Sequence, residues 1–126
     1  MKILIIDDEE MIRVIARKIL ERDGYEVLTA ESGIAGLEIL SAQPDDIELV
    51  LLDFVMDDMS GEDTLRRIRQ VSYDIPCIVS SGHIIDQKDL PEGLRDNVRI
   101  LQKPYQARVL SNMVKNMLSR DRVNAE

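Results

Sequence analysis

Residues 47–53 read IELVLLD, a run that is apolar except for one glutamate and that ends on an aspartate. A short run of this kind, rich in branched apolar side chains, is typical of a strand buried on both faces of a sheet. We therefore predict a strand over residues 47–52, with Asp53 at its carboxyl end. The start of the chain repeats the pattern, because the run KILII at residues 2–6 is followed by two aspartates.

Apolar runs and amphipathic stretches alternate on both sides of this segment. Further strands are predicted over residues 2–6, 25–30, 75–79 and 98–101. Helices are predicted over residues 10–22, from Ser32 to a point before Pro44, through Leu65, Ile68 and Val71, and over residues 105–120. Pro91 and Gly93 fall within residues 83–96 and favour a short or broken helix there. Gly24 is expected to end the first helix in a left-handed conformation.

Helical spacing also predicts which side chains face the core. In the first helix they are Met11, Val14, Ile15, Ile19 and Leu20, with basic residues on the other side. Ile34 and Val109 are expected to face inward from the second and the last helix.

Five alternations of strand and helix, with strands apolar on both faces, indicate an α/β fold. Helices then cover both faces of a parallel, doubly wound sheet. In such sheets ligands bind beyond the carboxyl ends of the strands, so functional side chains should directly follow the strands. The domain is expected to span residues 1–121, followed by a short polar tail at 122–126 that frays.

Acidic, hydroxyl and basic side chains do follow the predicted strands. They are Asp7 and Asp8 after the first strand, Asp53 after the third, Ser81 after the fourth and Lys103 after the fifth. Three carboxylates at one edge repel one another and need a cation, and hard oxygen ligands suit Mg²⁺. A carboxylate can also act as a nucleophile and become an aspartyl phosphate. A lysine ammonium and a serine hydroxyl can bind phosphoryl oxygens, which supplies the positioning and charge neutralisation that phosphoryl transfer needs.

The composition argues against several other classes of protein. The net charge is −8, whereas nucleic-acid backbones attract basic surfaces, so no direct nucleic-acid partner is expected. No apolar run approaches the roughly 20 residues that span a bilayer, so no membrane insertion is expected. The single cysteine, Cys77, excludes an internal disulfide. A cytoplasmic protein is the resulting expectation.

Along essentially its whole length, the sequence resembles the receiver domain of bacterial two-component response regulators, the CheY-like family. The family's acidic pair matches Asp7 and Asp8, its phosphoacceptor matches Asp53, its loop Met and Gly match Met56 and Gly61, its hydroxyl switch residue matches Ser81 before Gly82, and its Lys-Pro pair matches Lys103 and Pro104. Each short match is weak alone. All of them occur in order, and each set follows a predicted strand.

The resemblance implies a flavodoxin-like receiver fold, (βα)5, with strand order 2-1-3-4-5. It implies that Asp53 receives a phosphoryl group from a phosphohistidine of a sensor histidine kinase or a histidine phosphotransfer protein. Mg²⁺ would be held by Asp8, Asp53 and the backbone carbonyl of Val55, with Asp7 acting through water.

The resemblance further implies a cis Lys103–Pro104 bond and a switch in which Ser81 moves toward the phosphoryl group. The altered surface would bind a downstream protein target, and the chain is expected to lack its own output domain. It would be no enzyme beyond its own phosphorylation and dephosphorylation. Many receivers form phosphorylation-dependent dimers through their fourth and fifth helices, an expectation that Pro91 weakens here.

Some positions depart from the family pattern. Asp57, followed by Asp58, stands where Pro is usual, and these carboxylates either raise Mg²⁺ affinity or lie in water. Ile100 replaces an aromatic residue that in many relatives turns inward with the hydroxyl. Val55 and His83 occupy positions that influence phosphoryl hydrolysis in relatives.

Three alternatives use the same residues. A phosphatase of the haloacid-dehalogenase type needs a second acid two residues after the nucleophile, where this chain has Val55. It also needs an element that caps the substrate. A pseudo-receiver that signals without phosphorylation is disfavoured by the intact Asp8, Asp53 and Lys103. The chain is alternatively the excised receiver of a larger hybrid kinase or multidomain regulator.

Overall fold

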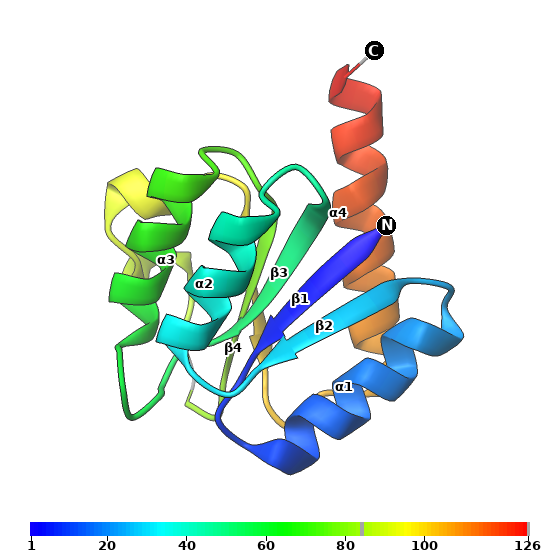
Figure 1. Cartoon of the computed structure of the whole chain (residues 1–126), viewed down its shortest axis with the longest axis horizontal. Helices are drawn as coiled ribbons and strands as arrows, with labels where there is room; N and C mark the ends of the chain where they lie inside the picture. The colour runs from blue at the N-terminus through cyan, green and yellow to red at the C-terminus, as the bar shows by residue number, and fades with distance from the viewer. Residues whose placement is uncertain (84, 126) are drawn as a thin grey trace.

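The apolar runs pair side by side as five parallel strands in one sheet, in the order β2-β1-β3-β4-β5 (Figure 1). This is a computed structural model, and it describes residues 1–83 and 85–125. The strands are β1 (Lys2–Ile6), β2 (Glu26–Ala30), β3 (Ile47–Asp53), β4 (Cys77–Ser81) and β5 (Val98–Gln102). The predicted fold class and strand order are therefore confirmed. The fourth strand begins and ends two residues later than the strand predicted at residues 75–79.

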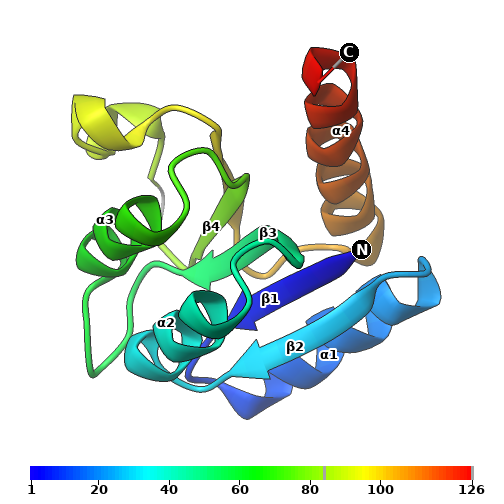
Figure 2. The ribbon, with the colours of Figure 1, turned by 45° about the horizontal axis from the view of Figure 1, so that its top comes forward.

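Helices cover both faces of the sheet, as Figure 2 shows. On one face, α2 (Gly33–Ala42) and α3 (Gly61–Val71) pack beside each other. On the other face, α1 (Glu10–Arg22) and α4 (Ala107–Ala125) do the same. Each face has its own apolar core, and residues 3–6 of β1 alternate between the two cores. Burial on both faces explains why β1 and β3 are almost continuously apolar.

Among the described residues, which exclude Ile84, no α-helix joins β4 to β5. The expected order of strands and crossovers is present, with four α-helices beside the five strands. Two short 3₁₀ turns, η1 (Gln87–Asp89) and η2 (Glu92–Leu94), stand there instead. This confirms the predicted break. Pro91 precedes η2 and cannot donate the amide that a continuous helix would need.

The predicted inner face of α1 was wrong at three positions. Met11, Val14 and Ile15 are 72%, 41% and 45% exposed. The buried residues are Ala16, Ile19 and Leu20. The apolar positions of this helix are thus spread around more of its circumference than the buried row of Ala16, Ile19 and Leu20. Ile34 on α2 and Val109 on α4 are likewise exposed, at 53% and 41%.

Helix ends follow local chemistry. Gly24 has φ +97°, as expected of a left-handed residue after α1. The last helix continues to Ala125, beyond the predicted end at residue 120 and into the expected tail, whose final residue, Glu126, lies outside the described residues. Among the described residues, none of the helices combines the length and the apolar composition needed to cross a bilayer.

Replacing Gly61 by alanine is expected to destabilise the fold. A methyl group at Gly61 would meet the backbone carbonyl oxygen and Cα of Phe54, which cannot turn away as a side-chain tip can. Overpacking of this kind costs about 1–3 kcal/mol, which urea denaturation would measure as a lower midpoint. Gly93→Ala is the matched control, because nothing lies within 4 Å of the added atom. Equal midpoints for the two variants would contradict the prediction.

Candidate metal centre

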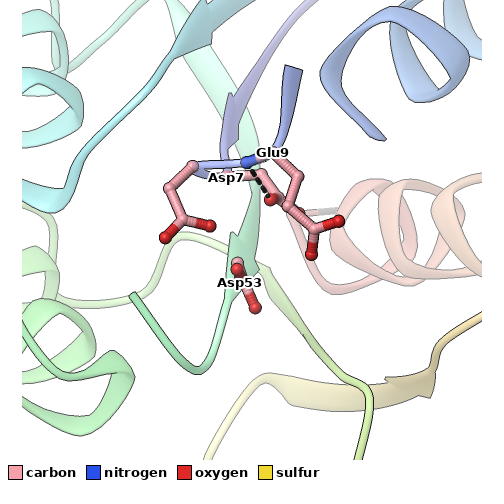
Figure 3. A group of neighbouring side chains, drawn as sticks. Asp7, Glu9 and Asp53 are labelled. Atoms are coloured by element: carbon pink, nitrogen blue, oxygen red, sulfur yellow. Dashed lines mark hydrogen bonds between the residues drawn. The ribbon is translucent and has the colours of Figure 1, made fainter. Parts of the chain in front are cut away.

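Four carboxylates meet at the carboxyl ends of β1 and β3. These strands are parallel neighbours, so the residues that follow them share one edge of the sheet. One side-chain oxygen from each of Asp7, Asp8, Glu9 and Asp53 lies within 4.8 Å of the others. Figure 3 shows Asp7, Glu9 and Asp53 around this edge. Asp7 and Asp53 are only 2% and 4% exposed, whereas Asp8 and Glu9 face solvent.

Lys103 supplies the cation that the structure places among these acids. Its Nζ atom lies 3.0 Å from Oδ2 of Asp7, 3.4 Å from Oδ1 of Asp53 and 3.6 Å from Oε1 of Glu9. The cis Lys103–Pro104 bond, expected from the resemblance, is present. The Lys103 amide also donates to the carbonyl of Ser81 at 2.7 Å, which anchors the turn after β5 to β4.

One ammonium against four carboxylates leaves a net negative charge at this edge. The donors are all hard oxygens, and two of the four side chains are open to solvent, which leaves room for water ligands. Mg²⁺ favours this combination, because it binds through one or two carboxylates and keeps several waters. The residues present therefore fit a magnesium site.

The electrostatics of the site separate Asp53 from an ordinary aspartate. Burial raises the pKa of Asp53 to about 6, and the charge of Asp7 adds to this, against the lowering influence of Lys103 and the Val55 amide. Burial lowers the pKa of Lys103, but the hydrogen bond and charge of Asp7, with Asp53 and Glu9, more than offset it and raise that pKa. The ammonium form of Lys103 is thus stabilised beside the acids.

Backbone contacts fix the two buried aspartates. Oδ1 of Asp53 accepts from the amide of Val55 at 3.3 Å, and the Phe54 amide donates to the carbonyl of Ser80 at 2.8 Å. Oδ1 of Asp7 accepts from the amide of Glu9 at 2.9 Å. Val55 thus lies against Asp53, while its carbonyl as a metal ligand stays a prediction.

Ser81 ends β4 at the same edge of the sheet and is buried. Its hydroxyl oxygen accepts from the backbone amide of His83 at 3.0 Å. That bond ties the serine to the loop that follows it. The predicted contact of Ser81 with a phosphoryl group stays a prediction.

Two residues near the site were missed from the sequence. Glu9 is the first: it joins the acidic cluster, and its place directly after the aspartate pair is the signal that could have indicated this. Tyr105 is the second: its hydroxyl is buried and is without a hydrogen-bond partner in the described part of the chain. Burial, with the charges of Asp7 and Asp53 and against Lys103, raises the pKa of Tyr105 to about 12.

Asp57 and Asp58 lie outside this cluster of carboxylates. Asp57 is exposed. Asp58 accepts hydrogen bonds from the amides of Gly33 and Ile34 at the start of α2. Neither is therefore placed with the acids that fit a metal.

Comparison with known proteins assigns this architecture. The family model described as the response regulator receiver domain matches residues 3–115. A response regulator receiver domain protein from Clostridium thermocellum, known from its crystal structure, is 35% identical in sequence to this chain. The match covers 97% of each chain and has a TM-score of 0.86. The receiver domain of the hybrid histidine kinase CckA is 29% identical over 94% of this chain and 99% of that one, with a TM-score of 0.80.

Similar curated proteins are longer than this chain. The sensor kinase CckA of Brucella abortus is 32% identical over 94% of this chain, which spans 12% of that kinase. The response regulator SaeR of Staphylococcus epidermidis is 30% identical over 94% of this chain, which spans half of that regulator.

Asp53→Asn is expected to stabilise the metal-free protein at about pH 8 and much less at about pH 4. The folded-state pKa of Asp53, about 6, exceeds the value of about 3.9 for an unfolded aspartate. The folded state therefore keeps the proton longer, and the associated stability is complete below the unfolded pKa and is lost as pH rises through 6. One pKa unit corresponds to about 1.4 kcal/mol, so a difference of about two units gives an upper bound of about 3 kcal/mol, which solvent screening reduces to the order of 2 kcal/mol at about pH 8.

Urea denaturation in EDTA at both pH values measures this difference. Asp45→Asn, at an exposed position, is the control and should change little at either pH. A variant at Asp53 that loses stability at about pH 8, or gains equally at both pH values, would contradict the assignment.

Proposed function

This chain belongs to the response regulator receiver domain family, and on that premise we propose that it accepts a phosphoryl group on Asp53 from a phosphohistidine. The observation that carries the proposal is the placement of Asp53. Its buried carboxylate ends β3 with the Lys103 ammonium 3.4 Å from its Oδ1 and with Asp7 beside the same ammonium. A nucleophile, a cation for the phosphoryl oxygens and acids for a metal thus share one edge of the sheet.

The transfer is an in-line displacement. A carboxylate oxygen of Asp53 forms a bond to phosphorus while the bond from phosphorus to the donor imidazole nitrogen breaks. If the other ring nitrogen of the phosphohistidine carries a proton, the products are an aspartyl phosphate and a neutral histidine. Lys103 is placed to pair with the charge that arrives. Asp8, Asp53 and the carbonyl of Val55 would hold Mg²⁺, with Asp7 acting through water, and the ion would neutralise charge on the phosphoryl oxygens. The chain would catalyse only its own phosphorylation and dephosphorylation.

The signal is proposed to leave through the loop after β4. Ser81 is bonded through its hydroxyl to the His83 amide, so movement of that hydroxyl toward a phosphoryl group must rearrange the loop. A downstream protein would read the altered surface. Since two short turns replace a regular fourth helix, a phosphorylation-dependent dimer through that face is the less favoured form of output.

A docking surface for the phosphodonor protein is proposed on α1. This helix begins at Glu10, next to the acidic cluster, and exposes Met11, Val14 and Ile15. Side chains three and four positions apart lie on one face of a helix, so these three form one apolar stripe beside Asp53. An apolar surface there fits a histidine kinase or a histidine phosphotransfer protein better than a nucleic acid, which the net charge of −8 would repel.

The setting of the receiver has two candidates. One is a cytoplasmic regulator that signals through its own surface without an output domain. The other is the receiver of a larger hybrid kinase or multidomain regulator. The match to 12% of the length of the sensor kinase CckA supports this alternative. The mass of the native protein in cell extracts, detected with an antibody to this domain, distinguishes them.

Acetyl phosphate and Mg²⁺ are expected to add the mass of one phosphoryl group to the protein and none to Asp53→Asn. Asparagine cannot supply the anionic nucleophile, so its variant should stay unmodified under the same conditions. Intact-protein mass spectrometry, with an EDTA control, measures the gain. Unmodified wild-type protein would contradict the proposal, and modification that persists in Asp53→Asn would move the acceptor elsewhere.

Met11→Asp is expected to slow phosphotransfer from a phosphorylated histidine phosphotransfer protein about tenfold or more, and to leave phosphorylation by acetyl phosphate unchanged. Burial of a methionine contributes about 1.5–3 kcal/mol, and each 1.4 kcal/mol is about tenfold in affinity. Tyr73→Asp is the control: Tyr73 is 87% exposed and lies between α3 and β4, at the opposite edge of the sheet. Equal rates for both variants would refute docking on α1.

A further inference from the structure

The amides in the first turn of α2 donate hydrogen bonds to side chains from two places in the chain. The first amides of a helix have no acceptor within the helix and need outside partners. Ser32 caps the helix locally, because its hydroxyl accepts from the amide of Ala35 at 3.0 Å. The other two amides are bound by one distant carboxylate. Gly33 donates to Oδ1 of Asp58 at 3.2 Å and Ile34 donates to Oδ2 at 3.0 Å.

Asp58 is suited to this position by charge. A helix N-terminus favours an anion, and α2 has no acidic residue in its own first turn. Burial acts to raise the pKa of Asp58, but the amides of Ile34 and Gly33 outweigh it and lower that pKa. Hydrogen bonds to an ionised acceptor are stronger than those between neutral groups. The carboxylate therefore holds α2 to the segment that carries it.

That segment is the β3–α3 loop, residues 54–60, which directly follows Asp53 of the candidate metal centre. At its start, the Val55 amide donates to Asp53. At its end, the Ser60 hydroxyl caps α3 and the Gly61 amide donates to the carbonyl of Phe54 at 2.9 Å. The loop sequence FVMDDMS contains neither proline nor glycine, so its shape depends on such contacts.

The contact between α2 and the loop is close. A methyl group at Gly33 would lie 2.8 Å from Oγ1 of Thr64 and 3.3 Å from Cβ of Met59. Asp58 thus binds at a point where α2, α3 and the loop are already packed together. Asp58 is exposed to solvent, as is its sequence neighbour Asp57, and both lie outside the cluster of carboxylates at the candidate metal centre.

We propose that Asp58 is a positioning residue for the candidate metal centre. By binding the amides of Gly33 and Ile34, it holds the β3–α3 loop against α2 and so keeps the backbone of Val55 against Asp53. Asp58 acts from outside the site and touches neither the metal nor the phosphoryl group. This inference rests on the proposed function and deepens it, because it assigns the geometry of the metal-binding loop to a contact with a helix on the sheet's flank.

The test compares Asp58→Ala with two controls in the full chain. Asp57→Ala removes the same charge from the adjacent position, and Ser32→Ala weakens the same helix end without releasing the loop. Asp58→Asn keeps one of the two acceptor oxygens without the charge and serves as the partial rescue. Calorimetric titration gives the dissociation constant for Mg²⁺, and amide NMR shifts of Val55, Gly33 and Ile34 report the loop and the helix end in the metal-free protein.

We expect Asp58→Ala to weaken Mg²⁺ binding about tenfold, the lower end of the usual effect of residues that support metal ligands from outside. The Val55 amide resonance should shift with it. Asp57→Ala and Ser32→Ala should stay within about twofold of the wild type, and Asp58→Asn, which keeps one of the two acceptor oxygens, should fall between Asp58→Ala and the wild type. An unchanged dissociation constant and an unmoved Val55 resonance in Asp58→Ala would overturn the proposal, as would equal weakening in Ser32→Ala or Asp57→Ala.

Failure of the proposed function would be visible separately. Wild-type protein that binds Mg²⁺ but gains no phosphoryl mass with acetyl phosphate would refute phosphorylation at Asp53. The role of Asp58 would still be judged by metal affinity and by the Val55 resonance.

Discussion

Repulsion among carboxylates at the shared edge of β1 and β3 is the constraint on which the site depends. Two aspartates that are almost fully buried lie beside one ammonium group, and two further acids lie within reach at the surface. An isolated buried charge is strongly unfavourable, so each of these groups requires the others or a bound cation. The folded cluster therefore favours the binding of a cation, because added positive charge reduces the repulsion among its carboxylates.

The parallel sheet is what brings these groups together. Because β1 and β3 are neighbours, residues separated by more than forty positions in sequence emerge at one edge. Lys103 reaches the same edge from β5 through a turn whose amide is bound to Ser81. Two layers of helices bury the strands, and the apolar cores on the two faces make the positions of the strand ends rigid.

Much of this arrangement could be predicted because it depends on order and period. Apolar runs that end in charged residues located the strands, and the parallel fold then required Asp7, Asp53 and Lys103 to meet. The inner face of α1 could not be predicted as well, because its wide apolar stripe fits more than one rotation of the helix about its axis, and only the packed structure shows that Ala16, Ile19 and Leu20 face inward. Glu9 and Tyr105 were missed because their part in the site depends on the three-dimensional path of the turns after β1 and β5. The contact of Asp58 with α2 joins residues about 25 positions apart through a loop, and no local pattern indicates it.

The two short turns described between β4 and β5, where the other crossovers have an α-helix, have a consequence for the distribution of local stability. An α-helix between β4 and β5 would add a cooperative ladder of backbone hydrogen bonds, whereas η1 and η2 are single turns, next to which or within which Leu90 and Leu94 are buried. Such a segment opens at lower free energy than the central strands, so its amides would exchange with solvent well before those of β1 and β3. The connection from Ser81 to this segment therefore joins an inner strand of the sheet to a segment that opens at lower free energy than that strand.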